Sequence, residues 1–170
     1  MTWNKASHGF TLIELLLYLG VTSIIISGVS FFMISLLEAR VKYQTISEVE
    51  QQGQQVLAQM TQTIRNAQNI TSPVTGTSGT SLTLDVVTAG LDPTLFDLSG
   101  GIIRVTEGVG AAQPLTTAAV TASSLSVENL TRPTTQGVLR VSFTLSRTST
   151  SGRNEFSYSK TFRGSARLRQ

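Results

Sequence analysis

Cysteine is absent from this sequence of 170 residues, and histidine occurs once, at His8. The absence of cysteine excludes disulfide frameworks and thiolate metal sites. Serine and threonine are abundant, but no base accompanies them, so they are typical of strands and turns rather than of nucleophilic sites. The glycine-bearing stretch 100–110 precedes neither a Lys-Ser/Thr pair nor a helical pattern, which argues against a phosphate-binding loop. We therefore expect a protein that is not an enzyme.

Acidic residues are too widely spaced to predict a metal site. Asp92 and Asp97 flank a short loop sequence and, with Asp85, could offer oxygen ligands to a calcium ion. They lack the dense spacing of a calcium-binding loop, and solvated loop acids explain them better. We therefore predict neither a metal nor a cofactor.

Charge is nearly missing from residues 10–37, where Glu14 is the only charged residue, and residues 15–37 carry no charge at all. As a helix, this uncharged part spans ~35 Å, enough to cross a hydrocarbon core of ~30 Å. The run is longer than the apolar region of a cleaved secretory signal, which has about 7 to 15 residues. We predict a membrane-spanning helix. Flanking positive charges are nearly balanced, so the amino terminus is placed inside mainly because the remaining chain resembles a folded domain.

Glu14 is the unexpected residue of this run. An ionised carboxylate at mid-helix in lipid costs on the order of 2.5 to 3.5 kcal/mol on insertion scales, and less near the interface. One explanation is local: in the first helical turn, free backbone N–H groups and the helix dipole favour a negative charge by about 0.3 to 1 kcal/mol. The alternative is cleavage between Gly9 and Phe10, which creates a positively charged amine that pairs with Glu14 of a neighbouring molecule.

The stretch "GFTLIELL" resembles the type III signal of type IV prepilins and of type II secretion pseudopilins. The resemblance implies that a membrane prepilin peptidase cuts after Gly9 and methylates the amine of Phe10, removing a leader of residues 1–9 that contains His8. It also implies that Glu14 pairs with the amine of an adjacent subunit during filament assembly. Many major pilins carry a proline at the position of Phe31, so a helix break is not predicted here.

The apolar period continues beyond the membrane segment. Residues on one helical face follow at spacings of three, four and seven: Val49, Val56, Met60, Ile64 and Ala67. Gly53 lies on this stripe, where either a close approach by another backbone or a tolerated surface position explains it. The opposite face is rich in glutamine and either solvated or packed against neighbours. We predict a helix from Phe10 to Asn69, with 10–37 in the membrane and 38–69 outside the cytoplasm.

Residues 70–170 are predicted to form a β-rich head. Period-two alternation predicts strands at 81–87, 101–107, 124–130, 137–147 and 155–164, with a hairpin connection at 148–154. Residues 88–100 and 108–123 are predicted to be loops or irregular, and the tail 163–170 to be exposed. The predicted fold is α+β and pilin-like: the long helix packs on one antiparallel sheet whose other face is wet.

The glutamine-rich helix, the threonine-rich strands and the ending "YSKTFRGSARLR" resemble J-type minor pseudopilins and W-type minor pilins. This second resemblance implies a single-pass protein of the inner membrane, with its head outside the cytoplasm. Such a subunit helps to initiate or cap a filament of a type IV pilus or a type II secretion pseudopilus. Its implied partners are other pilins or pseudopilins through the helix, the prepilin peptidase, the inner-membrane assembly platform and membrane lipid.

Positive charge is concentrated at the end of the chain. Residues 38–130 hold four Lys/Arg and eight Asp/Glu (4 − 8 = −4), whereas residues 131–170 hold eight Lys/Arg and one Glu (8 − 1 = +7). The eight are Arg132, Arg140, Arg147, Arg153, Lys160, Arg163, Arg167 and Arg169. Arg140 and Arg163 are candidates for a patch that binds DNA phosphates or lipid headgroups, which makes a DNA-binding minor pilin the alternative function. Otherwise these charges solubilise the sheet or pair with the acids of residues 38–130.

Overall fold

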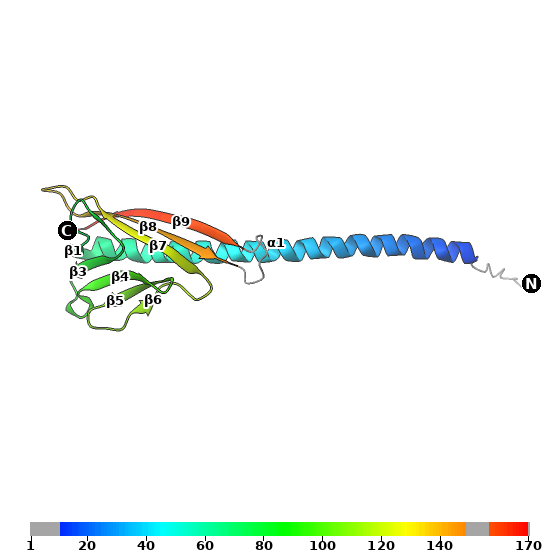
Figure 1. The fold of residues 1–170 in the computed structure, drawn as a ribbon, viewed down its shortest axis with the longest axis horizontal. Helices are drawn as coiled ribbons and strands as arrows, with labels where there is room; N and C mark the ends of the chain where they lie inside the picture. Colours follow the sequence, from blue (N-terminus) through cyan, green and yellow to red (C-terminus); the bar gives the residue numbers. More distant parts are fainter. Residues whose placement is uncertain (1–10, 149–156, 170) are drawn as a thin grey trace, which may run out of the picture. The chain divides into compact units, whose positions relative to one another are not determined.

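The computed structural model describes residues 11–148 and 157–169. The chain divides into two compact units, Met1–Val41 and Lys42–Gln170, and helix α1 (Leu12–Asn66) contributes to both. The predicted leader 1–9, Gly9, Phe10, most of the hairpin connection 148–154 and Phe156 lie outside the described residues. One long apolar helix is followed by antiparallel strands (Figure 1), which confirms the predicted α+β class.

Apolar side chains cover the helix of the first unit, and its hydroxyl groups are bonded within the helix. Ser27, Ser30 and Ser35 donate hydrogen bonds of 2.9, 2.8 and 3.1 Å to the carbonyl oxygen four residues earlier. Such bonds satisfy polar groups that find no water in lipid. By length and composition, α1 can cross a membrane.

The helix ends at Asn66, before the predicted Asn69, and strand β1 (Ala67–Ser72) begins at once. Ala67 is buried, as predicted, but it belongs to this strand and not to the helical stripe. It is paired with Val86 of strand β3. Pairing with β3 therefore replaces the last predicted turn of the helix, a long-range contact that local periodicity does not reveal.

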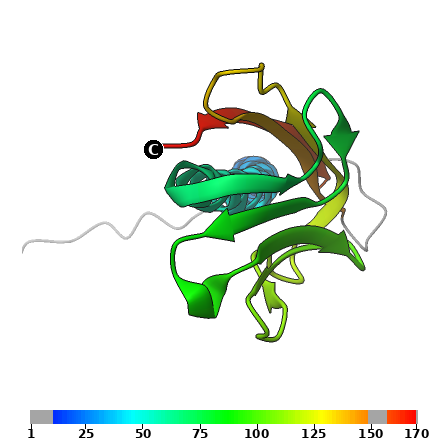
Figure 2. The ribbon, with the colours of Figure 1, turned by 90° about the vertical axis from the view of Figure 1, so that its left-hand side faces the viewer.

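The head contains two sheets where one was predicted. The five-stranded sheet has the order β1, β3 (Leu82–Val86), β4 (Thr94–Ser99), β5 (Ile102–Glu107) and β6 (Gln113–Pro114). The four-stranded sheet has the order β2 (Ser78–Gly79), β7 (Thr121–Asn129), β8 (Val138–Arg147) and β9 (Tyr158–Arg167). All neighbouring strands are antiparallel. Figure 2 shows the two sheets on different sides of the end of α1.

Two stretches predicted to be loops contain strands. Residues 88–100 hold the short 3-10 helix η1 (Ala89–Leu91) and β4, and residues 108–123 hold β6 and the start of β7. In β4 one of the inward positions is Thr94, which breaks the apolar alternation. Its hydroxyl donates a 2.8 Å hydrogen bond to the Leu91 carbonyl oxygen, so burial leaves no unpaired group.

The other predicted strands are confirmed in β3, β5, β7 and β8, and their predicted inward side chains are buried apart from the half-buried Val86. Strand β9 extends to Arg167, beyond the predicted 164. The prediction of an exposed tail is wrong for Ala166 and Leu168, each 4 % exposed. The Leu168 N–H also donates a 2.9 Å bond to the Gly137 carbonyl oxygen. The tail therefore completes the sheet.

Two glycines, one in α1 and one in β9, allow the helix and the four-stranded sheet to pack closely. A Cβ atom added to Gly53 would lie 2.1 Å from Cζ of Phe162, so only glycine leaves room for this ring of β9. Conversely, a Cβ atom added to Gly164 would lie 2.8 Å from Cδ1 of Leu57 on the helix. Of the two explanations offered for Gly53, the tolerated surface position is wrong; a close approach exists, but a side chain makes it rather than a backbone.

Candidate functional site

The amino-terminal end of α1 is capped by a side chain. The Thr11 hydroxyl oxygen accepts a 3.3 Å hydrogen bond from the backbone N–H of Glu14, and the Thr11 carbonyl oxygen accepts one of 3.2 Å from the N–H of Leu15. Threonine followed three residues later by glutamate is the capping-box pattern. Glu14 thus lies in the first turn of the helix, where free N–H groups favour its negative charge.

The first unit exposes an apolar surface around this acid. Leu12, Ile13, Ile24 and Phe31 are 78, 76, 74 and 74 % exposed. No residue of α1 is buried before Thr45 within the part that the structure describes. An apolar surface of this extent is stable only against lipid or other protein chains. This surface is therefore suited to contact with lipid or with the helices of other chains.

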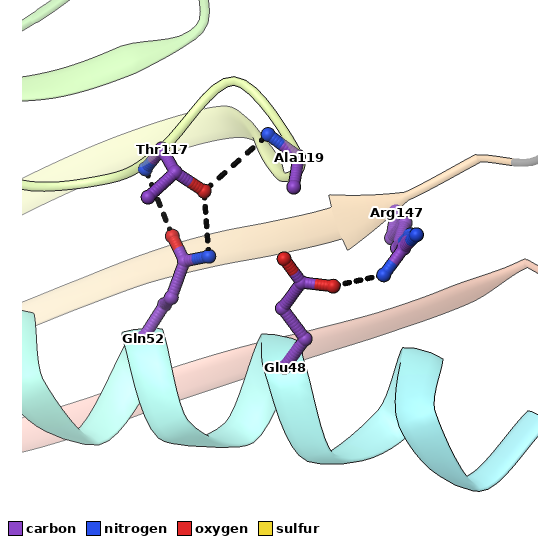
Figure 3. Close-up of polar contacts among 5 residues, drawn as sticks. All are labelled: Glu48, Gln52, Thr117, Ala119 and Arg147. Carbon is purple, nitrogen blue, oxygen red and sulfur yellow. Dashed lines mark hydrogen bonds and ion pairs between the residues drawn. The ribbon is translucent and has the colours of Figure 1, made fainter.

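In the second unit, polar side chains of α1 bind a loop residue and the end of a strand of the head (Figure 3). Gln52 forms two hydrogen bonds with Thr117: its Nε2 donates to the hydroxyl at 2.8 Å, and its Oε1 accepts from the N–H at 2.9 Å. One turn earlier, Glu48 forms an ion pair with Arg147 at the end of β8. This part of the glutamine-rich face is therefore neither simply solvated nor available to a neighbour.

Glu50 makes a third such contact. Its carboxylate accepts hydrogen bonds from Nζ of Lys160 at 2.7 Å and from the hydroxyl of Tyr158 at 3.3 Å. The bond from Lys160, and then its charge, lower the pKa of Glu50, whereas partial burial opposes the shift. The same pair raises the pKa of Lys160. Both groups are thus held in their charged forms at neutral pH.

The basic residues at the chain end fall into two classes. Arg140 pairs with Glu128 at 3.1 Å, Arg147 with Glu48 and Lys160 with Glu50. These three confirm that acids of residues 38–130 neutralise part of the positive charge within the same chain. Arg132, Arg163, Arg167 and Arg169 make no ion pair within residues 11–148 and 157–169, and Arg153 lies outside the described residues.

Two surface hollows adjoin these arginines. The first, of about 430 Å³, is lined by Arg140, Ser142, Arg163, Gly164 and Ser165. The second, of about 400 Å³, is lined by Arg65, Gln136 and residues 165–169. The structure therefore brings Arg140 and Arg163 together and adds Arg65 from the end of the helix. In the sequence, Arg65 is far from the basic tail, so sequence reasoning did not include it in the patch. Its position in the last turn of the helix was the only feature that could have suggested it.

The three acids considered for calcium have protein partners. Asp97 pairs with Arg104, Asp92 accepts a 3.1 Å bond from the N–H of Val86, and Asp85 accepts a 2.6 Å bond from the Thr71 hydroxyl. Among the described residues, no group of three or more His, Cys, Asp or Glu side chains is arranged to hold a metal ion.

Comparison with known proteins identifies the start of the chain. Residues 4–30 match the family model described as the prokaryotic N-terminal methylation motif. No curated protein and no solved structure matches the chain. The matched residues include Gly9, Phe10 and the capped, acid-bearing first turn of α1. The chain thus carries the class III signal of type IV pilins, which supports its place in the type IV pilin-like superfamily and its anchoring in a membrane.

Proposed function

We propose that this protein is a minor pilin or pseudopilin, a structural subunit that helps to initiate or cap a type IV pilus or a type II secretion pseudopilus. It is inserted into the inner membrane by a single helix, with its head outside the cytoplasm. Prepilin peptidase cuts after Gly9 and methylates Phe10, and the assembly platform then delivers the subunit to the filament. This role requires no catalytic site.

The observation that carries the proposal is the matched methylation motif with Glu14 in the first turn of an apolar helix. An unpaired carboxylate in lipid is costly, and one capped helix end offsets only about 0.3 to 1 kcal/mol of that cost. The amine of Phe10 on a neighbouring subunit supplies the missing positive charge. Pairing of the two groups favours helices that pack in register, as filament assembly requires.

The minor role is supported by the head. The glutamine-rich helix segment, the strands β7 to β9 rich in Ser and Thr and the basic ending are the features that resemble J-type pseudopilins and W-type pilins. The glutamine contacts of this helix are also directed partly inward, since Gln52 binds Thr117 of its own head. We therefore assign the filament contacts mainly to the apolar surface of residues 12–41.

Two measurements on the full chain test the proposal. Mass spectrometry of membrane-extracted protein should find a methylated Phe10 as the first residue in a host that has the peptidase. Glu14→Gln should be processed normally but lose most of its incorporation into sheared filaments. Glu107→Gln, which removes an exposed acid of the head, is the matched control and should assemble normally. An intact amino terminus, or equal assembly of Glu14→Gln and the control, contradicts the proposal.

A further inference from the structure

We propose that Arg65, Arg163, Arg167 and Arg169 form a binding strip for the phosphate backbone of double-stranded DNA. We call these four residues the arginine strip. The inference does not depend on filament assembly, because all four residues belong to the second unit and none belongs to the methylation motif. It shifts the DNA-binding alternative from Arg140, which pairs with Glu128, to arginines that have no ion pair within residues 11–148 and 157–169.

Strand geometry aligns the strip. Arg163, Ser165 and Arg167 alternate along β9 with the buried Phe162, Ala166 and Leu168, so they share the outer face. Alternate residues of a strand lie about 6.7 Å apart. Arg169 follows in the same alternation and is exposed.

The end of the helix adds the fourth arginine. The backbone N–H of Arg169 donates a 3.0 Å hydrogen bond to the carbonyl oxygen of Arg65, which fixes the chain end beside the last turn of α1. Arg65, Arg167 and Arg169 line one hollow, and Ser165 joins it to the hollow lined by Arg163. The four arginines therefore line two hollows that share Ser165 and form one continuous surface.

The arginine strip lacks the acidic partners that four other cations of the head have. Arg104, Arg140, Arg147 and Lys160 each form an ion pair with an acid. Neither hollow has an Asp or Glu in its lining, and the strip residues form no ion pair within the described chain. Four arginines on one surface, with no acidic partner in the described part of the chain, create a positive potential that attracts a polyanion.

The chemistry of the strip favours phosphodiester groups on a duplex. Guanidinium groups bind phosphate oxygens bidentately, and serine hydroxyls such as those of Ser142 and Ser165 donate to them as well. Among the described residues, no aromatic side chain lines either hollow, so these hollows offer no platform for the base stacking on which single-strand binding depends. The six residue steps from Arg163 to Arg169 extend about 20 Å, a length over which a duplex presents about 12 phosphates.

Membrane headgroups are a less suitable source of the same phosphate chemistry. The first unit, which contains the membrane-compatible segment, joins the head at Lys42. Within α1, Arg65 lies about 35 Å from Lys42 at the usual helical rise. A strip for headgroups is expected beside this junction, where Lys42 itself is exposed.

The test measures binding of a fluorescent random-sequence duplex to the full chain in neutral detergent micelles, over a series of NaCl concentrations. Four phosphate contacts predict a slope of log K against log salt of about −3.6. Each Arg→Gln substitution in the strip should reduce the slope by about one unit, and the affinity about three- to tenfold. The quadruple Arg→Lys variant should keep most of the slope, because it keeps the charges. Lys42→Gln, which removes an exposed cation at the opposite end of α1 within the head, should change little.

Three results would overturn the assignment. A quadruple Arg→Gln variant that remains folded by circular dichroism and binds the duplex with the original slope excludes the strip. An equal loss in Lys42→Gln shows that net charge alone drives binding. Tighter binding of phosphatidylglycerol vesicles or polygalacturonate through the same arginines assigns the strip to a different polyanion. Filament incorporation of the quadruple variant is scored separately and should be normal, because Glu14 and the processing signal are unchanged.

Discussion

Helix α1 is used differently on the two sides of the boundary between the units. Within the described residues, none of its side chains is buried before Thr45, whereas six residues are buried between Thr45 and Ile64. The first stretch satisfies its own polar groups by backbone bonds from Ser27, Ser30 and Ser35 and leaves its apolar side chains exposed. The second stretch buries one face under its own sheets. The apolar surface of the first stretch is thus left for lipid or other chains to cover, whereas the head of the same chain covers that of the second stretch.

Replacing glycine by alanine should show the largest difference in stability between the two stretches of α1. Gly53→Ala places a methyl group 2.1 Å from Cζ of Phe162, and relief requires the ring or the helix to move. We expect a loss of about 2 to 3 kcal/mol in the free energy of unfolding of the head, because overpacking outweighs the gain in helix propensity. Thermal unfolding of the full chain in detergent, followed by circular dichroism, measures it.

The matched controls lie in the first stretch of the same helix. Gly20 and Gly28 have no atom within 4 Å of an added Cβ atom, so Gly20→Ala and Gly28→Ala should leave the unfolding transition of the head unchanged. Combining Gly53→Ala with Phe162→Leu should recover part of the loss, because the smaller side chain vacates the ring position. A loss in Gly28→Ala as large as in Gly53→Ala contradicts the distinction between the stretches.

Replacing polar side chains of the second stretch should change the unfolding free energy by a smaller amount, and the amount should depend on whether the side chain contacts the head. Gln52→Ala removes two hydrogen bonds to Thr117 and should cost about 1 to 2 kcal/mol of unfolding free energy. Gln59→Ala is the control, since Gln59 is exposed and its side chain forms no hydrogen bond with the described part of the chain. It should be neutral or slightly stabilising, because alanine is the better helix former. Chemical denaturation of both variants compares them, and equal losses would show that Gln52 has no special role.

Sequence periodicity predicted the elements whose own residues carry the signal. Apolar residues recur at helical spacing from Val49 to Ile64 and at every second position of β8, and the structure buries both sets. Strand β4 was missed because Thr94 occupies an inward position and depends on a hydrogen bond for its burial. The tail was missed because Ala166 is small and Leu168 lies between Arg167 and Arg169, so the stretch resembled a polar segment.

Long-range pairing accounts for the remaining differences. The division of the head into two sheets depends on which strands pair with each other. A 2.7 Å hydrogen bond from the Ala122 N–H of β7 to the Gly101 carbonyl oxygen, just before β5, connects the two sheets. No local pattern specifies such a contact. The arginine strip is similar, because Arg65 and Arg169 are far apart in sequence and meet only when β9 ends beside α1. Glu14 is the opposite case: its motif and its place in the first turn are both local, and both were predictable.

The smallest effect that we predict is the loss, at low pH, of the stability that Glu50 contributes. Because its folded-state pKa is lowered, Glu50 contributes stability that is fully present above its unfolded pKa of about 4.5 and is lost as the pH falls through the lower folded value. Both partners are largely solvated, so the contribution is small and is reduced further by salt. In thermal unfolding across the acid range, Glu50→Gln should melt below the unchanged protein at neutral pH, and the two melting temperatures should converge below about pH 4. Glu107→Gln, in which the lost acid has no ion pair among the described residues, should show no such convergence. A difference in melting temperature that is constant at every pH would show that Glu50 acts through packing. In that case, charge does not stabilise the contact between the start of β9 and the second stretch of the helix.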